Sequence, residues 1–480
     1  MMRSQLLSWV LVLLLYPLPS FFAAPLTLST QDPQPSILFM LSSLAISGGN
    51  ISILQEAIEM RRKGMLVSLA VSRKHVPADY VSLIMALSSA ITTEGVRDMI
   101  IIYDGNCCWP KAPSSELVRL ARSFDIVIAT YHTTALALEV IVKDHPHLMP
   151  AYYVQDYEPW FTCNPFECPF RNKLTFYNRW LNKPLVTKEK HFKYTESTYS
   201  VVSGKVFLFA KTKWIKKMVE DNHKDTHVHL VTPSIDHTVY YPELDFLKMK
   251  AKVARMLPLK SLKSTPPGSI VGKIKIIAML RPRTPRRNTL ICLDTLLKLA
   301  NEYPTLVQVS FFGVDRTQLT ALVASLVEIR GMAPYRSSSM LRREGGEGTV
   351  KVLGLLKQRH DLAKLYRSSD LFVDMSWWQA FGRTAVEAMA CGCVPIMPSV
   401  GAGSDVCEGG RVCQYHDGTD EVGYYAVVES LVQNHTERLR MMEAGLTRAG
   451  EYSIRQAASS IQAALRTGLT DFRRKNLVSL

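Results

Sequence analysis

The 480-residue sequence lacks several short patterns that identify common ligand sites. No GxGxxG follows its early apolar runs, which excludes the dinucleotide-binding fingerprint. No two of its nine cysteines have CxxC spacing, so no zinc site is predicted. Beyond the N-terminal segment, no stretch approaches the roughly 20 apolar residues that a membrane-spanning helix needs. These absences remove the simplest interpretations of the chain as a dehydrogenase, a zinc protein or a multi-pass membrane protein.

Acidic residues are also relatively few. The chain has 42 acidic and 57 basic residues, giving a formal net charge of +15, and 47% of its residues are hydrophobic. This composition is globular, and the positive charge suits anionic lipid or phosphorylated small molecules. The basic residues do not form one tract with interleaved aromatics, so we expect no nucleic-acid partner.

The N-terminus carries the chain's one long hydrophobic segment. Leu6 to Tyr16 is nearly all apolar, and Arg3 is the last charge before Asp32. This pattern predicts a signal peptide or signal anchor over residues 1–30. Phe21 and Phe22 stand where cleavage needs a small residue, which slightly favours an uncleaved anchor. The expectation is a single-pass protein of the endoplasmic reticulum or Golgi membrane, or a secreted protein if the signal is cleaved.

Two series of alternating strands and helices follow. Short apolar strands and amphipathic helices alternate over residues 36–256 and again over residues 274–455. Residues 257–273 between them are rich in Pro, Ser, Gly and Lys, as linkers are. The fold class predicted is therefore α/β, with two Rossmann-like domains facing a cleft and residues 456–480 as a C-terminal helix or tail.

The most informative segment runs from Asp370 to Pro395. Its pattern predicts a strand, a Gly-containing loop, a short apolar helix and a second strand, which is where an open α/β sheet binds its ligand. Glu387 is the one charge in the apolar part of that helix and needs a partner. Thr384-Ala-Val-Glu387 has capping-box spacing, so Glu387 serves either the helix start or a ligand.

The cysteines leave two interpretations open. Cys163 and Cys168, and likewise Cys407 and Cys413, are close enough in sequence to form disulfides. The alternative is that most cysteines are free thiols, since Cys292, Cys391 and Cys393 lie in core-like contexts.

The order of these parts resembles retaining glycosyltransferases of the GT-B fold, family 4 (group 1), from about residue 36 to about residue 455. The strongest match is Phe381-Gly382 followed by Val386-Glu387-Ala-Met-Ala-Cys-Gly392. Gln379 departs from the pattern, because the family usually has Glu there. The run from Tyr152 to Pro159 also resembles a rhamnosyltransferase-like sub-branch.

The resemblance implies roles for the donor site. Glu387 would bind a ribose, and the transferred sugar would face Gln379. The diphosphate would be held by the arginine-rich turn with Arg281, Arg286 and Arg287, one of the last two replacing a family Lys; the alternative is a solvated basic turn. Gly48 and Gly49 let the backbone approach the donor phosphate or the acceptor, unless they only form a tight turn. The backbone N–H groups of Ala380, Phe381 and Gly382 would contact the donor.

The remaining roles concern the reacting centre and the acceptor. Some family members place a His in the first half near the reacting atoms, and His132 would be that residue, catalytic together with Gln379 and Arg281. The alternative is that His132 is a loop histidine with no role. Asp156 and Glu158 lie among Tyr153, Tyr157 and Trp160, which would form a sugar-stacking surface for the acceptor; the alternative is that these are core aromatics beside a strand end.

The activity implied is hexosyl transfer from a nucleoside-diphosphate sugar to a glycan or glycoconjugate with retention of configuration. No metal cofactor is expected, since the resemblance implies none and no Asp-x-Asp is present to hold one. Because the Gln379 amide carries no charge, the alternative is a non-catalytic protein of the same fold that binds carbohydrate or nucleotide.

Overall fold

The computed structural model describes residues 34–45, 47–88, 90–107, 111–161, 192–245, 273–330, 350–356 and 358–478. The predicted N-terminal segment, Cys163 and Cys168 lie outside these ranges, as does the predicted linker apart from Lys273.

The first half is a seven-stranded parallel sheet in the order β3-β2-β1-β4-β5-β6-β7. Its strands are β1 (Ser36–Leu41), β2 (Leu66–Ser72), β3 (Ile100–Tyr103), β4 (Ile126–Ala129), β5 (Met149–Val154), β6 (Phe207–Ala210) and β7 (Val228–Leu230). Its helices are α2 (Gly48–Arg62), α3 (Tyr80–Met85), α4 (Thr93–Met99), α5 (Ser115–Ala121), α6 (His132–Ala135), α7 (Ala137–Asp144) and α10 (Lys213–Asn222).

The second half is a six-stranded parallel sheet in the order β10-β9-β8-β11-β12-β13. Its strands are β8 (Ile274–Met279), β9 (Val307–Phe312), β10 (Val350–Val352), β11 (Leu371–Val373), β12 (Val394–Pro398) and β13 (Gln414–His416). Its helices are α12 (Thr289–Glu302), α13 (Arg316–Arg330), α15 (Arg359–Arg367), α16 (Arg383–Ala390), α17 (Gly403–Val406), α18 (Glu421–Gln433) and α19 (His435–Gly450), and the chain ends in α20 (Ile454–Val478).

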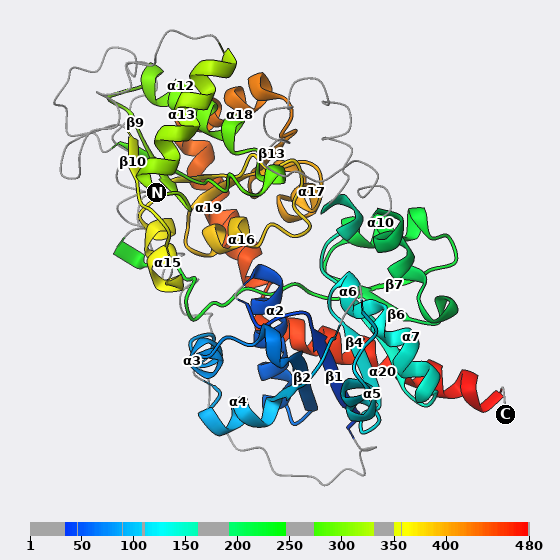
Figure 1. Cartoon of the computed structure of the whole chain (residues 1–480). Coiled ribbons are helices and arrows are strands. Elements are labelled where there is room, and N and C mark those ends of the chain that lie inside the picture. Colours follow the sequence, from blue (N-terminus) through cyan, green and yellow to red (C-terminus); the bar gives the residue numbers. More distant parts are fainter. Residues whose placement is uncertain are drawn as a thin grey trace, which may run out of the picture. The chain divides into compact units, whose positions relative to one another are not determined.

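Each sheet is buried on both faces by helices, which is why the sequence of its strands is a series of continuous apolar runs. In the first half, α2 and α4 cover one face and α5, α7 and α10 the other (Figure 1). In the second half, α12 and α18 cover one face, and α15 and α16 the other. The doubly wound α/β class predicted from the sequence is confirmed.

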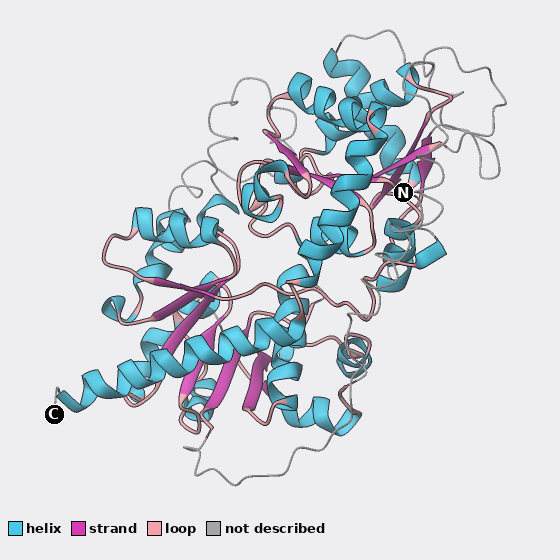
Figure 2. Cartoon of the chain, turned by 180° about the vertical axis from the view of Figure 1, so that it is seen from behind, coloured by secondary structure: helices cyan, strands magenta, loops and turns pink. Residues whose placement is uncertain are grey.

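The C-terminal helix α20 returns to the first half of the chain. Ala458, Ile461 and Leu465 on this helix are fully buried in the core beneath α2, and Figure 2 shows the helix lying along the first sheet. Arg473 Nη2 near its end lies 2.7 Å from Asp125 Oδ1. The segment predicted as a helix or tail is thus a structural part of the N-terminal sheet's covering layer.

The predicted single-pass localisation in a secretory-pathway membrane needs correction. None of the helices in the described ranges is long and apolar enough to cross a bilayer. The finding contradicts that localisation, and we withdraw it.

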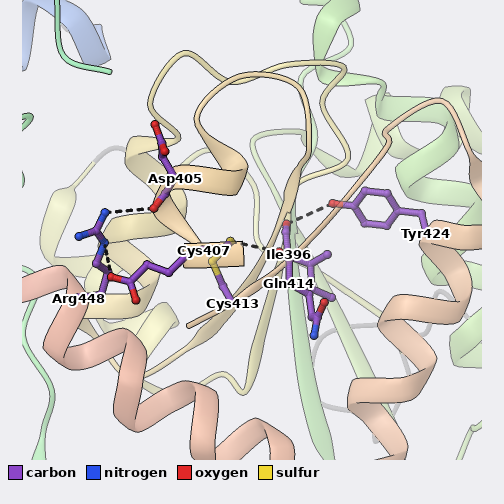
Figure 3. The surroundings of a disulfide bond; sticks show 8 residues. Ile396, Asp405, Cys407, Cys413, Gln414, Tyr424 and Arg448 are labelled. Carbon is purple, nitrogen blue, oxygen red and sulfur yellow. Dashed lines mark hydrogen bonds and ion pairs between the residues drawn. A yellow bond between two sulfur atoms is a disulfide. The ribbon is translucent and has the colours of Figure 1, made fainter. Parts of the chain in front are cut away.

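Of the two disulfides considered from the sequence, the one whose cysteines lie in the described ranges is present. Cys407 and Cys413 are bonded in the turn between α17 and β13 (Figure 3). Beside it, Arg448 of α19 donates a hydrogen bond of 3.1 Å to the Asp405 carbonyl and pairs with Glu408. Cys292, Cys391 and Cys393 are buried free thiols, as expected.

Candidate functional site

Most of the predicted site residues follow the strands at which each sheet reverses its order, whereas Asp156 and Glu158 follow β5. In the first sheet β1 leads to Gly48 and β4 leads to His132; in the second, β8 leads to the arginine-rich turn and β11 to Asp374. Carboxyl ends of strands at such reversal points form a crevice in open α/β sheets. The residues singled out in the sequence after these four strands therefore stand where open α/β sheets bind their ligands.

Gly48 and Gly49 are the first two residues of α2, where the sequence predicted a loop. Ser47 caps the helix by accepting a hydrogen bond from the Asn50 amide. A methyl group on Gly49 would lie 3.1 Å from Gln155 Oε1, and one on Gly48 would lie 4.0 Å from Arg383 Cδ. The glycines therefore let α2 begin close to side chains from β5 and from the second half, and its positive dipole end lies there.

The arginine-rich turn between β8 and α12 contacts both halves. Arg286 Nη1 lies 3.3 Å from Asp156 Oδ2 in the first half, and its guanidinium lies over the Trp378 ring at 5.4 Å. Arg287 Nη1 lies 3.3 Å from Asp374 Oδ2, and burial lowers the pKa of Arg287 to about 10. Arg281 is exposed. Of the three candidate phosphate ligands, Arg281 is thus the most accessible.

Gln379 is buried and held by both its backbone and its side chain. Its amide N–H donates to the Val400 carbonyl at 3.1 Å, and its carbonyl accepts from the Ala402 N–H at 2.8 Å. Its side-chain Nε2 donates to Asp374 Oδ2 at 2.5 Å and lies 3.3 Å from the Ser376 hydroxyl. Gln379, the residue that departs from the family pattern, is therefore held in a single position by these hydrogen bonds.

The next three residues lead into α16. The Ala380 carbonyl accepts a 2.9 Å hydrogen bond from the Thr212 hydroxyl of the first half. Phe381 packs edge-on against Tyr452 at 5.4 Å between ring centres. Gly382, with a φ of +78°, is in the left-handed conformation that favours glycine and precedes the first helical residue.

Glu387 does not form the capping box. The helix begins at Arg383 with Gly382 at the cap and no side-chain capping bond, which puts Glu387 one turn in. Its Oε1 accepts a 2.8 Å hydrogen bond from Arg383 Nε on the same face of the helix. Burial raises the pKa of the Glu387 carboxyl, and the Arg383 charge opposes that rise.

Arg383 also reaches the first half, a role that the sequence did not reveal. Its Nη1 donates to the Ser52 hydroxyl at 2.7 Å, and its Nη2 donates to Gln55 Oε1 at 3.1 Å. Gln55 Nε2 in turn donates to Asp236 Oδ2 at 2.9 Å, which also lies 2.8 Å from Arg359 Nη2. The only sequence signal was polar residues on an otherwise apolar face of α2.

His132 is paired with Glu158 in the interior of the first half. Glu158 Oε2 lies 2.7 Å from both the backbone nitrogen and Nδ1 of His132. Burial raises the pKa of Glu158, and the His132 contacts oppose this rise. Glu158 thus positions the imidazole, and the structure joins two residues that were predicted for different roles.

Asp156 lies nearby but faces the second half. Its carboxylate pairs with Arg286, and Oδ1 lies 3.4 Å from Trp378 Nε1. Burial raises the pKa of Asp156, against the opposing charge of Arg286. Trp160 packs edge-on against both Trp214 and Trp378, so the tryptophan beside this carboxylate also contacts an aromatic side chain of the first half.

Comparison with known proteins gives a family match in the second half of the chain. Residues 319–434 match the model of the family glycosyl transferases group 1. No curated protein matches the sequence of the chain.

Solved structures share the fold across the chain. HepE of Anabaena in complex with UDP is 14% identical with a TM-score of 0.59, over 90% of this chain and 100% of that one. Sucrose-phosphate synthase from Thermosynechococcus elongatus is 11% identical with a TM-score of 0.57, over 93% and 100%. A glycosyltransferase from Rickettsia africae is 14% identical with a TM-score of 0.56, over 92% and 99%. The chain thus has the GT-B fold that its sequence predicted, and its second half contains a group 1 glycosyltransferase match.

Proposed function

We propose that the protein is a retaining glycosyltransferase of the family 4 type. It would transfer a hexosyl group from a nucleoside-diphosphate sugar to a hydroxyl of a glycan or glycoconjugate. The observation that carries this proposal is the arrangement at the second reversal point. There the arginine-rich turn, Gln379 and Glu387 follow adjacent strands, and Arg286 and Arg383 connect them to the first half.

The diphosphate leaving group determines what the site must supply. As the bond from the anomeric carbon to the diphosphate breaks, negative charge grows on the phosphate oxygens. Arg281 would neutralise it, together with Arg286 or Arg287, the N-terminus of α2 at Gly48 and Gly49, and the backbone of Ala380 to Gly382. With these groups the reaction would need no metal ion, so EDTA should leave turnover unchanged.

The ribose would be held by Glu387. A carboxylate accepts hydrogen bonds from two vicinal hydroxyls, provided that it is ionised. Arg383 favours the ionised form in a buried position where desolvation disfavours it. HepE has been crystallised with UDP and with UDP-glucose, which supports testing uridine nucleotides first.

The acceptor would enter from the first half, beside His132 and Asp156. The acceptor oxygen replaces the diphosphate on the same face of the sugar and loses its proton to the departing phosphate or to solvent. His132, fixed by Glu158, would contact the reacting sugar, and Trp160 and Trp378 offer aromatic surface to a glycan.

A nucleotide and donor panel tests the proposal. Binding of UDP, GDP, ADP and dTDP is measured by calorimetry, and hydrolysis of the corresponding sugar nucleotides by release of the nucleotide. We expect one base to be preferred and Arg281→Ala and Glu387→Ala each to weaken its binding at least about tenfold, as lost charge-assisted hydrogen bonds do. Arg474→Ala is the control, because that arginine lies on the exposed part of α20.

Gln379 favours a second candidate, a non-catalytic protein that binds a nucleotide or carbohydrate. Tight binding with no hydrolysis or transfer for any donor would support that candidate and refute the enzyme.

A further inference from the structure

Hydrogen-bond donors surround the side chain of Asp374 at the carboxyl end of β11. Oδ1 accepts from the Ser376 N–H at 3.0 Å and from the Ser376 hydroxyl. Oδ2 accepts from Gln379 Nε2 at 2.5 Å and lies 3.3 Å from Arg287 Nη1. The residue is 7% exposed, so these contacts are made away from bulk water.

This arrangement fixes which end of the Gln379 amide faces Asp374. An ionised carboxylate only accepts hydrogen bonds, so the amide must turn its NH₂ group toward Asp374. Gln379 Oε1 is then directed away, and among the described residues none donates a hydrogen bond to it.

A family Glu at position 379 would present a carboxylate oxygen to the donor sugar. Gln379 presents an amide oxygen that can also accept a hydrogen bond from a hydroxyl, and the Asp374 carboxylate lies one hydrogen bond away on the NH₂ side of the amide. In a buried site of low dielectric, a charge at that separation still stabilises developing positive charge on a sugar.

Resting on the proposed function, we propose that Asp374 is a positioning residue for donor recognition. Asp374 orients the Gln379 amide so that Oε1 accepts a hydrogen bond from a hydroxyl of the transferred sugar. The Asp374 carboxylate also supplies the negative charge that Gln379 lacks. Arg287 contacts the same carboxylate at 3.3 Å and helps to hold it in place.

The test is a double-mutant cycle in the full chain. Asp374→Asn removes the carboxylate that orients the amide, and Gln379→Glu places two carboxylates against each other. The double variant Asp374→Asn/Gln379→Glu exchanges the two groups: the new amide at position 374 can donate to the new carboxylate at position 379, which itself faces the sugar. Asp370→Asn is the matched control, since Asp370 loses the same charge at the opposite end of β11, where it accepts from the Lys275 N–H.

UDP-glucose hydrolysis is the first readout, and the ratio of the affinities for UDP-glucose and UDP is the second. Each single variant should lose at least about tenfold in kcat or in that ratio, with UDP affinity retained. The double variant should recover most of the loss, and Asp370→Asn should match the wild type. Recovery of this kind is not expected of a contact that serves stability alone.

Three results would count against the inference. Additive losses in the double variant would show that the two residues do not act as a pair. Recovery of the thermal midpoint without recovery of kcat or of the affinity ratio would make the contact purely structural. A wild-type protein that binds neither UDP nor UDP-glucose refutes the UDP-glucose form of both proposals, whereas failure of the cycle in an active wild type refutes only this one.

Discussion

Arg383, the first residue of α16, donates a 2.7 Å hydrogen bond to the hydroxyl of Ser52 in α2, which is 331 positions earlier in the sequence. The same guanidinium holds Glu387. The residue proposed to bind the ribose is therefore coupled to the half of the molecule in which the acceptor would bind.

Replacing Arg383 should weaken nucleotide binding, although Arg383 is not among the residues proposed to contact the nucleotide. Arg383→Ala leaves Glu387 buried without its cation, so the carboxyl should protonate more readily and hold a ribose less well. We expect a loss of at least about tenfold in UDP affinity by calorimetry, and Arg383→Lys should recover it only in part because the lysine lacks the planar fork.

Lys213→Ala is the matched control for Arg383. Lys213 also joins the halves, through Asp405 at 3.5 Å, but its side chain is 76% exposed. Such exposed pairs contribute little, so its loss should leave affinity and stability near those of the wild type. Equal effects of the two substitutions on UDP affinity would contradict the claim that Arg383 supports nucleotide binding through Glu387.

Gly401→Ala should disrupt the site by displacing Gln379. Gly401 has a φ of +105°, and an added Cβ would lie 2.0 Å from the Gln379 carbonyl oxygen. Gly409 also has a positive φ, +65°, with nothing within 4 Å of such a Cβ. Both substitutions should incur about 1 kcal/mol of backbone strain, and only Gly401→Ala should lose substantially more stability and donor binding. Similar thermal midpoints and affinities for the two variants would refute the steric argument.

Part of the free energy of unfolding should depend on the ionisation of Asp236 and be lost in acid. Although burial opposes it, hydrogen bonds from Thr238 and the Arg359 charge keep the pKa of Asp236 below its ordinary value of 3.8. The stabilisation is therefore fully present above about pH 3.8 and is lost as pH falls through the lower pKa of the folded state.

Thermal midpoints of wild type and Asp236→Asn, measured from pH 7 down to pH 3, check this sign. The variant should be less stable at pH 5–7, and the difference should shrink toward pH 3. Asp79→Asn, which removes an exposed carboxylate with no capping bond, should track the wild type throughout. A difference between wild type and Asp236→Asn that grows on acidification would show that the Asp236 contribution has the opposite sign.

The Cys407–Cys413 disulfide should stabilise the second half. The bond closes a short loop between α17 and β13, with a sequence separation of 6. Chain-entropy arguments give about 2 kcal/mol for a loop of this length, so Cys407→Ser/Cys413→Ser should lower the unfolding midpoint measurably. Adding reductant should bring the wild type close to the variant and leave the variant unchanged; a variant as stable as the oxidised wild type would show that the bond contributes nothing.

The sequence by itself determined the architecture. The alternation of short apolar runs with amphipathic segments predicted two parallel sheets, and both are present. It also predicted which loops follow the strand ends, because a parallel sheet places all those ends at one edge. Glu387 was identified correctly as a buried charge that needs a partner, although that partner is Arg383 and not the helix cap.

Only the tertiary structure decided which side chains pair. Hydrophobic periodicity indicates that one face of a helix is buried, but it does not indicate which element covers that face. For this reason, α20 could not be assigned to the first half from its own residues. Nor could the sequence join Arg383 to Ser52, Gln55 to Asp236 or Asp374 to Gln379. Hydrogen bonds and ion pairs depend on atoms within a few ångströms, and only the packed chain brings these side chains to that distance.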